Sequence, residues 1–164
     1  CQIMLEPGRA LVADSGVLLC RVIEVKGTLE RRFVIVDAAM NDLLRPALYD
    51  AWHPINPVIQ VAKNSLSEVV DVVGPVCESG DILGRARALP HLVAGDLLAI
   101  GSVGAYGSVM SSSYNTRAPA AEVLVHQGRS AVIRPRLPLD VLINQDCMPD
   151  WLSMGSKNSG EAGR

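Results

Sequence analysis

The stretch Ser67–Asp81 carries the clearest signal of the fold, and it consists of SEVVDVV followed by GPVCESGD. Its first seven residues are rich in valine, which predicts a β-strand. The proline and the two glycines that follow predict that the strand ends in a segment of turns. This segment sets a thiol beside a carboxylate, at Cys77 and Glu78. The sequence therefore predicts a strand that leads into a loop bearing a Cys–Glu pair.

Short apolar runs of the same kind recur on both sides of this stretch: Gln2–Leu5, Val17–Val25, Phe33–Val36, Val58–Val61, Leu97–Ile100, Ala121–Val125 and Ser130–Arg134. Polar, glycine-containing segments separate the second run from the third and the sixth from the seventh, which predicts two hairpins. Asp81–Leu89 mixes arginine and glycine with apolar residues and stays ambiguous. Many short strands separated by turns favour a mainly β domain, either a barrel or a sandwich.

Short helices are expected to interrupt this β framework. Asn41 or Asp42 can cap a helix that continues through Tyr49, and Leu139–Gln145 has the pattern of a final helix. Gly101–Ser113 is rich in glycine and serine, a composition typical of a loop or short helix that brings backbone close to a ligand. The polar, glycine-rich end of the chain predicts a flexible tail over residues 151–164.

Composition limits the class of protein. The 164 residues are 49% hydrophobic and 20% charged, so the chain can bury one core. A net charge of -2 with both signs interspersed argues against nucleic acid or a membrane surface as the main partner. No apolar run is long enough to span a bilayer. The chain opens without an initiator Met, so we expect the natural N-terminus to lie elsewhere.

The four cysteines are widely spaced, at Cys1, Cys20, Cys77 and Cys147, and form no CxxC pair. Their spacing predicts neither a zinc site nor a disulfide framework, and it fits a reducing cytoplasm. No metal site is expected. Cys1, Cys20 and Cys147 are expected to be small buried side chains, which is the commonest fate of a free cysteine.

Three further motifs accompany the Cys–Glu pair: Glu6-Pro7-Gly8-Arg9, the run Asn41–Tyr49, and Gly104-Ala105-Tyr106-Gly107. Arg45 and Tyr49 are four residues apart on the predicted helix, so they would share one face and could bind a carboxylate together. Taken singly, each motif has a simpler interpretation. The first could be a turn with a surface ion pair, Arg45 a solvated side chain, Tyr106 a core aromatic, and Cys77 a buried thiol.

Taken together and in this order, the four motifs resemble the C-terminal part of the diaminopimelate decarboxylase family, whose enzymes use pyridoxal 5'-phosphate (PLP). The resemblance implies an N-terminal eight-stranded α/β (TIM) barrel that binds PLP and a C-terminal β-domain that completes the site of a homodimer. Residues 1–16 would then be the last barrel strand and its loop, and residues 17–150 the β-domain. The barrel's Schiff-base lysine is not in this chain, so the chain alone is expected to be inactive.

The resemblance also assigns roles to residues. Glu6, Pro7, Gly8, Arg9 and Tyr106 would contact the cofactor, with the Glu6 carboxylate holding a proton on the pyridine nitrogen. Arg9, Arg45, Tyr49, Glu78 and Tyr106 would contact the substrate. Cys77 would act in the partner subunit's site as the proton donor after CO2 leaves, because a thiol is mostly protonated near neutral pH.

The implied reaction converts meso-2,6-diaminopimelate to L-lysine and CO2 in the cytoplasm. Two alternatives stay open: a related decarboxylase acting on ornithine, arginine or carboxynorspermidine, and a β-domain that only binds or dimerises. Substrates without a distal carboxylate would not need Arg45. The family usually has glycine where this chain has Ala39, and we expect Ser112–Arg117 to have a structural or interface role.

Overall fold

The computed structural model describes residues 1–28, 30–60 and 66–153. Its main feature is a six-stranded sheet in the order β3-β6-β1-β2-β4-β5. These strands are β1 (Leu18–Gly27), β2 (Arg32–Val36), β3 (Ile55–Pro57), β4 (Ser67–Val73), β5 (Ile82–Pro90) and β6 (Leu97–Ile100). A separate ribbon of two strands consists of β7 (Glu122–His126) and β8 (Arg129–Arg134).

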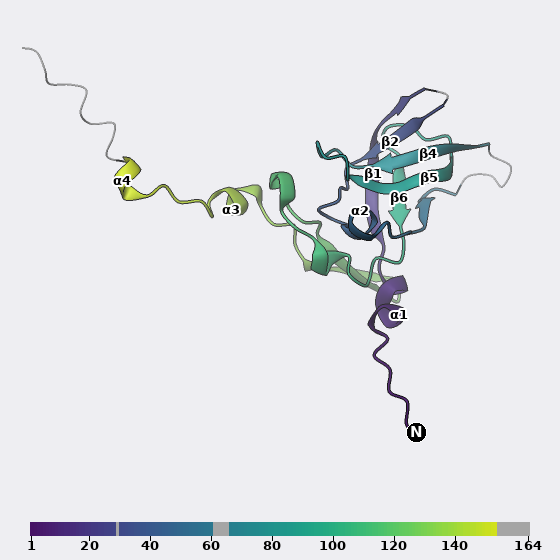
Figure 1. The fold of residues 1–164 in the computed structure, drawn as a ribbon, viewed down its shortest axis with the longest axis horizontal. Helices are drawn as coiled ribbons and strands as arrows, with labels where there is room; N and C mark the ends of the chain where they lie inside the picture. Colours follow the sequence, from purple (N-terminus) through teal and green to yellow (C-terminus); the bar gives the residue numbers. More distant parts are fainter. Residues whose placement is uncertain (29, 61–65, 154–164) are drawn as a thin grey trace, which may run out of the picture.

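The helices are all short: α1 (Gly8–Val12), α2 (Arg45–Tyr49), α3 (Leu139–Ile143) and α4 (Asp150–Ser153), with 3-10 turns at Ala13–Ser15, Ser108–Met110 and Tyr114–Thr116. Figure 1 shows α2 against the sheet, whereas α3 and α4 run away from it. No helix in the described ranges is long and apolar enough to cross a membrane.

The six-stranded sheet curls toward a closed barrel. All neighbouring strands are antiparallel except β2 and β4, which are parallel. The pairing of β1 with β2 shifts between Val22 and Glu24, and such a bulge bends a strand. The terminal strands β3 and β5 meet, since a Cβ placed on Gly84 would lie 2.7 Å from Cδ1 of Ile55. Of the two architectures left open by the sequence, the barrel is the one formed.

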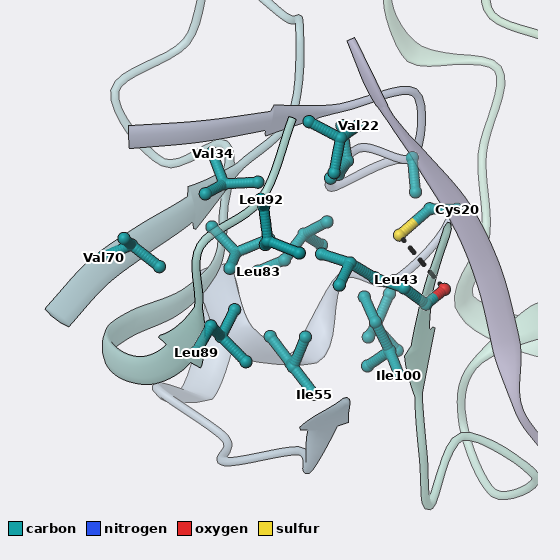
Figure 2. Packing of buried hydrophobic residues seen from close by; sticks show 14 residues of the cluster. Cys20, Val22, Val34, Leu43, Ile55, Val70, Leu83, Leu89, Leu92 and Ile100 are labelled. Carbon is teal, nitrogen blue, oxygen red and sulfur yellow. Dashed lines mark hydrogen bonds between the residues drawn. The ribbon is translucent and has the colours of Figure 1, made fainter. Parts of the chain in front are cut away.

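Alternate residues of the strands fill the interior of the curled sheet (Figure 2). The fully buried side chains include Val22 of β1, Val72 of β4, Leu83 of β5 and Ile100 of β6. Cys20 lies in this core, and its thiol donates a hydrogen bond to the Leu98 carbonyl at 3.7 Å (Figure 2). Burial, helped by the negative charges of Asp37 and Asp42, raises the pKa of this thiol to about 12.

Most of the predicted strands form. β4 has the predicted bounds, both predicted hairpins are present, and the ambiguous segment Asp81–Leu89 contains most of β5. The expected burial of Cys20 is confirmed, but Cys1 and Cys147 are exposed. Of the tail expected over residues 151–164, residues 151–153 lie in α4, and residues 154–164 are outside the described residues.

Two strand predictions were wrong. The strand expected at Val58–Val61 forms earlier, as β3, because Ile55 is the residue that enters the core and pairs with Ile100 of β6; Val61 itself is not described. Gln2–Leu5 forms no strand, and its side chains are exposed. A strand needs a neighbour for its backbone hydrogen bonds, and none of the strands described pairs with this segment.

The N-cap predicted for the helix that ends at Tyr49 was also wrong. α2 begins only at Arg45, with Leu44 in the cap position. Asp42 instead closes the preceding turn, where Oδ2 accepts a hydrogen bond from the Ala39 N–H at 3.0 Å. Ala39 is fully buried and does not have a positive φ, so the alanine at this position is not strained.

Candidate functional site

Arg45 lies at the centre of a cluster of ring contacts. Its guanidinium carbon is 5.2 Å from the ring centroid of Tyr49 and 5.3 Å from that of Tyr106. The predicted shared face of Arg45 and Tyr49 is confirmed. Both distances are within the range of cation–π attraction, which orients the guanidinium but leaves its in-plane N–H donors free. In the part of the chain that is described, Arg45 has no ion-pair partner, so these donors are available to an anion.

The motif Glu6-Pro7-Gly8-Arg9 lies beside the same cluster of rings. A Cβ placed on Gly8 would lie 3.5 Å from the hydroxyl oxygen of Tyr106. Gly8 is the first residue of α1 and Pro7 is its N-cap. Glu6 and Arg9 are exposed, and within the described residues their side chains make no hydrogen bond or ion pair. Two motifs from opposite parts of the sequence are therefore neighbours at Tyr106.

Tyr106 is held by an unusual backbone conformation. Its φ is 60°, in the left-handed region that residues other than glycine rarely occupy. The flanking Gly107 has no room for a side chain, because a Cβ there would lie 2.4 Å from the Val103 carbonyl oxygen. In this tight turn Tyr106 is 43% exposed, whereas Ala105 beside it is buried.

The Cys77–Glu78 pair lies in the loop between β4 and β5. Both residues are exposed, so Cys77 is not a small buried side chain. The Glu78 carboxylate accepts a hydrogen bond from the Gly80 N–H at 3.3 Å. Among the described residues, no hydrogen bond, ion pair or ring contact joins this loop to Tyr106 or Arg45. The structure thus brings Gly8, Arg45, Tyr49 and Tyr106 together and leaves the Cys–Glu pair apart from them.

Asp81 fixes the Cys–Glu loop, a role that the sequence motifs did not predict. Its carboxylate is buried and accepts hydrogen bonds from the N–H of Val76 at 2.8 Å and of Met40 at 2.7 Å. Gly74 is required beside it, because a Cβ there would lie 2.3 Å from Oδ2 of Asp81. Burial raises the pKa of Asp81, although the two backbone N–H groups and Arg117 oppose that rise. Asp81 closes the same eight-residue motif, so its place is visible in the sequence, but its burial is not.

The turn before α2 is tied to a distant loop. Asn41 is buried, and its amide donates to the Ser112 carbonyl at 3.2 Å while its Oδ1 accepts from Nε of Arg117 at 3.0 Å. Arg117 also donates to the Asp37 carbonyl. The same turn carries Met40, which donates to Asp81. One rigid turn therefore connects α2, with Arg45, to the loop with Cys77.

A groove of about 430 Å³ lies beside Tyr106. Its walls come from the segment around Val17, the loop that contains Tyr106, and the β7–β8 ribbon. The three histidines are elsewhere: His53 is buried with Nδ1 3.1 Å from the Gly101 carbonyl oxygen, His91 pairs with Glu68, and His126 is exposed. No group of three His, Cys, Asp or Glu side chains suited to a metal ion occurs within the described ranges.

Residues 10–104 match the family model described as the C-terminal sheet domain of pyridoxal-dependent decarboxylase. This chain belongs to the pyridoxal-dependent decarboxylase family. Arg45, Tyr49, Cys77 and Glu78 lie within the matched residues, whereas Glu6–Arg9 and Tyr106 lie just outside them. The family membership inferred from the four motifs is confirmed.

Two relatives that this chain resembles are diaminopimelate decarboxylases. That of Zymomonas mobilis is 49% identical over 152 residues, which are 93% of this chain and 35% of the relative. That of Pseudomonas aeruginosa is 52% identical over 134 residues, which are 82% of this chain and 32% of the relative. The chain thus spans about a third of the length of these curated relatives.

Solved structures agree with the fold. The M. jannaschii diaminopimelate decarboxylase in complex with L-lysine has a TM-score of 0.83 and 44% identity, covering 90% of this chain and 33% of that one. The Helicobacter pylori enzyme with L-lysine has a TM-score of 0.78 and 46% identity, covering 85% of this chain and 34% of that one. An arginine decarboxylase from Paramecium bursaria Chlorella virus, at 22% identity and a TM-score of 0.62, shares the fold.

Proposed function

We propose that this chain is the C-terminal part of a PLP-dependent diaminopimelate decarboxylase, which converts meso-2,6-diaminopimelate to L-lysine and CO2. The observation that carries the proposal is the cluster of Gly8, Arg45, Tyr49 and Tyr106. It offers a phenol hydroxyl and a guanidinium that has no ion-pair partner among the described residues, both at one point of the surface. The curated relatives at about half identity carry the name of this enzyme.

The residues around Gly8 fit a phosphorylated cofactor. Gly8 presents backbone without a side chain beside the Tyr106 hydroxyl. The Arg9 guanidinium, which has no partner in the described part of the chain, could bind a phosphate or carboxylate. Glu6 supplies a carboxylate that can keep a pyridine nitrogen protonated, and Pro7 sets the backbone between them. When bound, PLP supplies an electron sink at the carbon that loses CO2. The lysine that would hold PLP covalently comes from outside this chain.

Arg45 and Glu78 match the far end of the substrate. Diaminopimelate carries a second amino group and a second carboxylate there. Arg45 would bind the distal carboxylate through its N–H fork, with the Tyr49 and Tyr106 rings holding the guanidinium in place. Glu78, whose carboxylate is exposed, would bind the distal ammonium. Ornithine and arginine lack the distal carboxylate, so this set of groups favours diaminopimelate.

Cys77 would return a proton to the carbon that has lost CO2. Its exposed thiol sits in a loop tied down by Asp81, which fixes where the proton is offered. Because no hydrogen bond, ion pair or ring contact joins this loop to the Tyr106 cluster within the described residues, we propose that it completes the site of a partner subunit in a cytoplasmic homodimer. Each site would then take Arg45 from one subunit and Cys77 from the other.

The test uses a chimera in which this chain replaces its matched stretch of the Zymomonas mobilis diaminopimelate decarboxylase. With PLP, the chimera should release L-lysine from meso-diaminopimelate and not decarboxylate ornithine or arginine. The 164-residue chain with PLP alone should release none. A chimera that binds PLP but prefers ornithine would contradict the assignment of the substrate.

A separate experiment tests whether Cys77 acts in the active site of the partner subunit. Cys77→Ala in the chimera should lower kcat by about a hundredfold while the PLP absorbance stays. Mixing this variant with one that lacks the Schiff-base lysine should restore part of the activity, because a heterodimer then contains one complete site. If the mixture stays inactive although heterodimers form, Cys77 does not serve the partner's site.

A further inference from the structure

Two glycines allow the segment after α1 to touch the loop that carries Tyr106. A Cβ on Gly104 would lie 2.0 Å from the Val12 carbonyl oxygen and 2.8 Å from Oγ of Ser15. A Cβ on Gly16 would lie 2.4 Å from the Gly104 nitrogen. Real side chains never come this close, so the two backbones can meet only where both residues are glycine.

Hydrogen bonds close this contact from both sides. The Gly104 N–H donates to the Ala13 carbonyl at 2.9 Å, and the Val103 N–H donates to the Gly16 carbonyl at 3.1 Å. In addition, Oγ of Ser102 donates to Oδ1 of Asp14 at 2.6 Å. We call residues 13–16 together with residues 102–104 the glycine latch.

Along the chain, the latch connects the two parts that meet at the candidate site, namely Gly8 at the start of α1 and the side chain of Tyr106. On one side, residues 13–16 follow α1, which begins at Gly8. On the other side, residues 102–104 lead directly into Tyr106 with its φ of 60°. The hydroxyl of Tyr106 is next to Gly8, and its ring is against Arg45. A shift at the latch would therefore move the phenol relative to both partners.

We propose that the glycine latch is a positioning device for Tyr106, with Ser102 and Asp14 as positioning residues that touch neither cofactor nor substrate. The latch sets the distance between the Tyr106 hydroxyl and the Gly8 backbone, and hence the geometry of the anion site. The effect on catalysis rests on the proposed function, but the effect on the Tyr106 side chain does not. A merely structural contact would stabilise the fold without acting through this hydroxyl.

The decisive experiment is a double-mutant cycle in the chimera described above. Ser102→Ala removes the hydroxyl that bonds Asp14 and adds no bulk, so folding is retained. It should raise the apparent Kd for PLP by about fivefold, the ratio expected for one hydrogen bond. Relative to the control Ser130→Ala, its thermal midpoint should fall only by the small amount that one exposed hydrogen bond contributes. Ser130 is exposed in β8, and its hydroxyl has no partner among the described residues.

In a Tyr106→Phe background, Ser102→Ala should have no further effect on the Kd, because the group through which it acts is already gone. An effect of the same size in both backgrounds would overturn the proposal, since the latch would then act on the fold as a whole. No effect in either background would overturn it as well.

A second measurement does not depend on activity. In the 164-residue chain, the Val103 and Gly104 amides should exchange slowly with solvent, and the NMR signals of the Tyr106 ring should move in Ser102→Ala but not in Ser130→Ala. Fast exchange of both amides in the unsubstituted chain, or unmoved ring signals, would refute the latch. If the amides exchange slowly and the Tyr106 signals move, but the chimera releases no lysine, then the proposed function is wrong and the positioning role of the latch is retained.

Discussion

β4 and β7 have nearly the same local pattern and opposite environments. In β4, SEVVDVV buries Val70 and Val72, whereas in β7, EVLVH leaves Val123 and Val125 exposed to 53% and 70%. β4 has a hydrogen-bonded strand on each side and a core beneath it, but among the strands described β7 pairs only with β8. Alternating valines therefore determine that a strand forms, while its burial depends on what packs against it.

The ribbon is tied to the rest of the chain by polar groups at its open end. Ser108 donates a hydrogen bond to Glu122, and Arg134 donates to the Ser108 hydroxyl at 2.9 Å. An isolated pair of strands is at best marginally stable in water. The curled sheet should thus differ from the ribbon in how much stability it loses when a side chain is shortened, and from its exposed loops in how slowly its thiol is labelled.

The largest expected contrast is in thiol labelling. In variants that keep one cysteine each, the buried Cys20 should react with a maleimide about a thousandfold or more slowly than the exposed Cys77, because the sheet must first open. The raised pKa of Cys20, about 12, slows the reaction further by keeping the thiol protonated. Rates that agree within tenfold would show that the sheet is as open as its loops.

The next largest contrast is in the stability lost when one apolar side chain is shortened in the sheet or in the ribbon. Leu83→Ala, in the centre of the sheet, should lower the free energy of unfolding by about 2–5 kcal/mol, since it leaves a cavity in a fully buried position. The matched control Val125→Ala, on the ribbon, should change it by about 0.5 kcal/mol or less. Urea denaturation of both variants measures the difference, and equal losses would mean that the ribbon is buried in solution.

A substitution at Asp81 tests whether this side chain anchors the loop that carries Cys77. Asp81→Ala should cost about 1–3 kcal/mol, because the Val76 and Met40 N–H groups lose their buried acceptor. Replacing the exposed carboxylate in Glu24→Gln should cost almost nothing. Faster hydrogen exchange at Val76 in the Asp81 variant would accompany the loss, and unchanged exchange there would contradict the anchoring role.

The smallest effect is a dependence of stability on pH. Burial raises the pKa of Asp81 above its ordinary value of 3.8, so the folded chain holds this proton more tightly than the unfolded chain. The free energy of unfolding should therefore fall as pH rises from about 3.8 through the folded pKa. This component should be missing in Asp81→Asn, while the same component from Asp42, whose pKa is also raised, remains. If the free energy of unfolding has the same pH dependence in the unsubstituted chain and in Asp81→Asn, this prediction is wrong.

Several elements could be predicted because their signals are local. β4 formed with its predicted bounds, and the hairpins around Gly27 and Gly128 formed because glycine can adopt the positive φ that each turn needs, 128° and 73°. The N-cap at Asn41 or Asp42 was wrong because both side chains are used elsewhere: Asp42 closes the preceding turn, and Asn41 bonds the distant Ser112 and Arg117. Asp81 was missed because nothing local distinguishes a buried carboxylate from an exposed one.

By itself, the sequence determined the mainly β class, the family through its four motifs, and the shared helix face of Arg45 and Tyr49. Each depends on residues close together in the chain, whose periodicity and turn chemistry act locally. Only the tertiary structure decided that Ile55 closes the sheet against Gly84, and that Gly16 meets Gly104 so that Tyr106 reaches Gly8. Those contacts join distant segments, and they depend on shape complementarity and on the entropy of closing long loops, which no local pattern encodes.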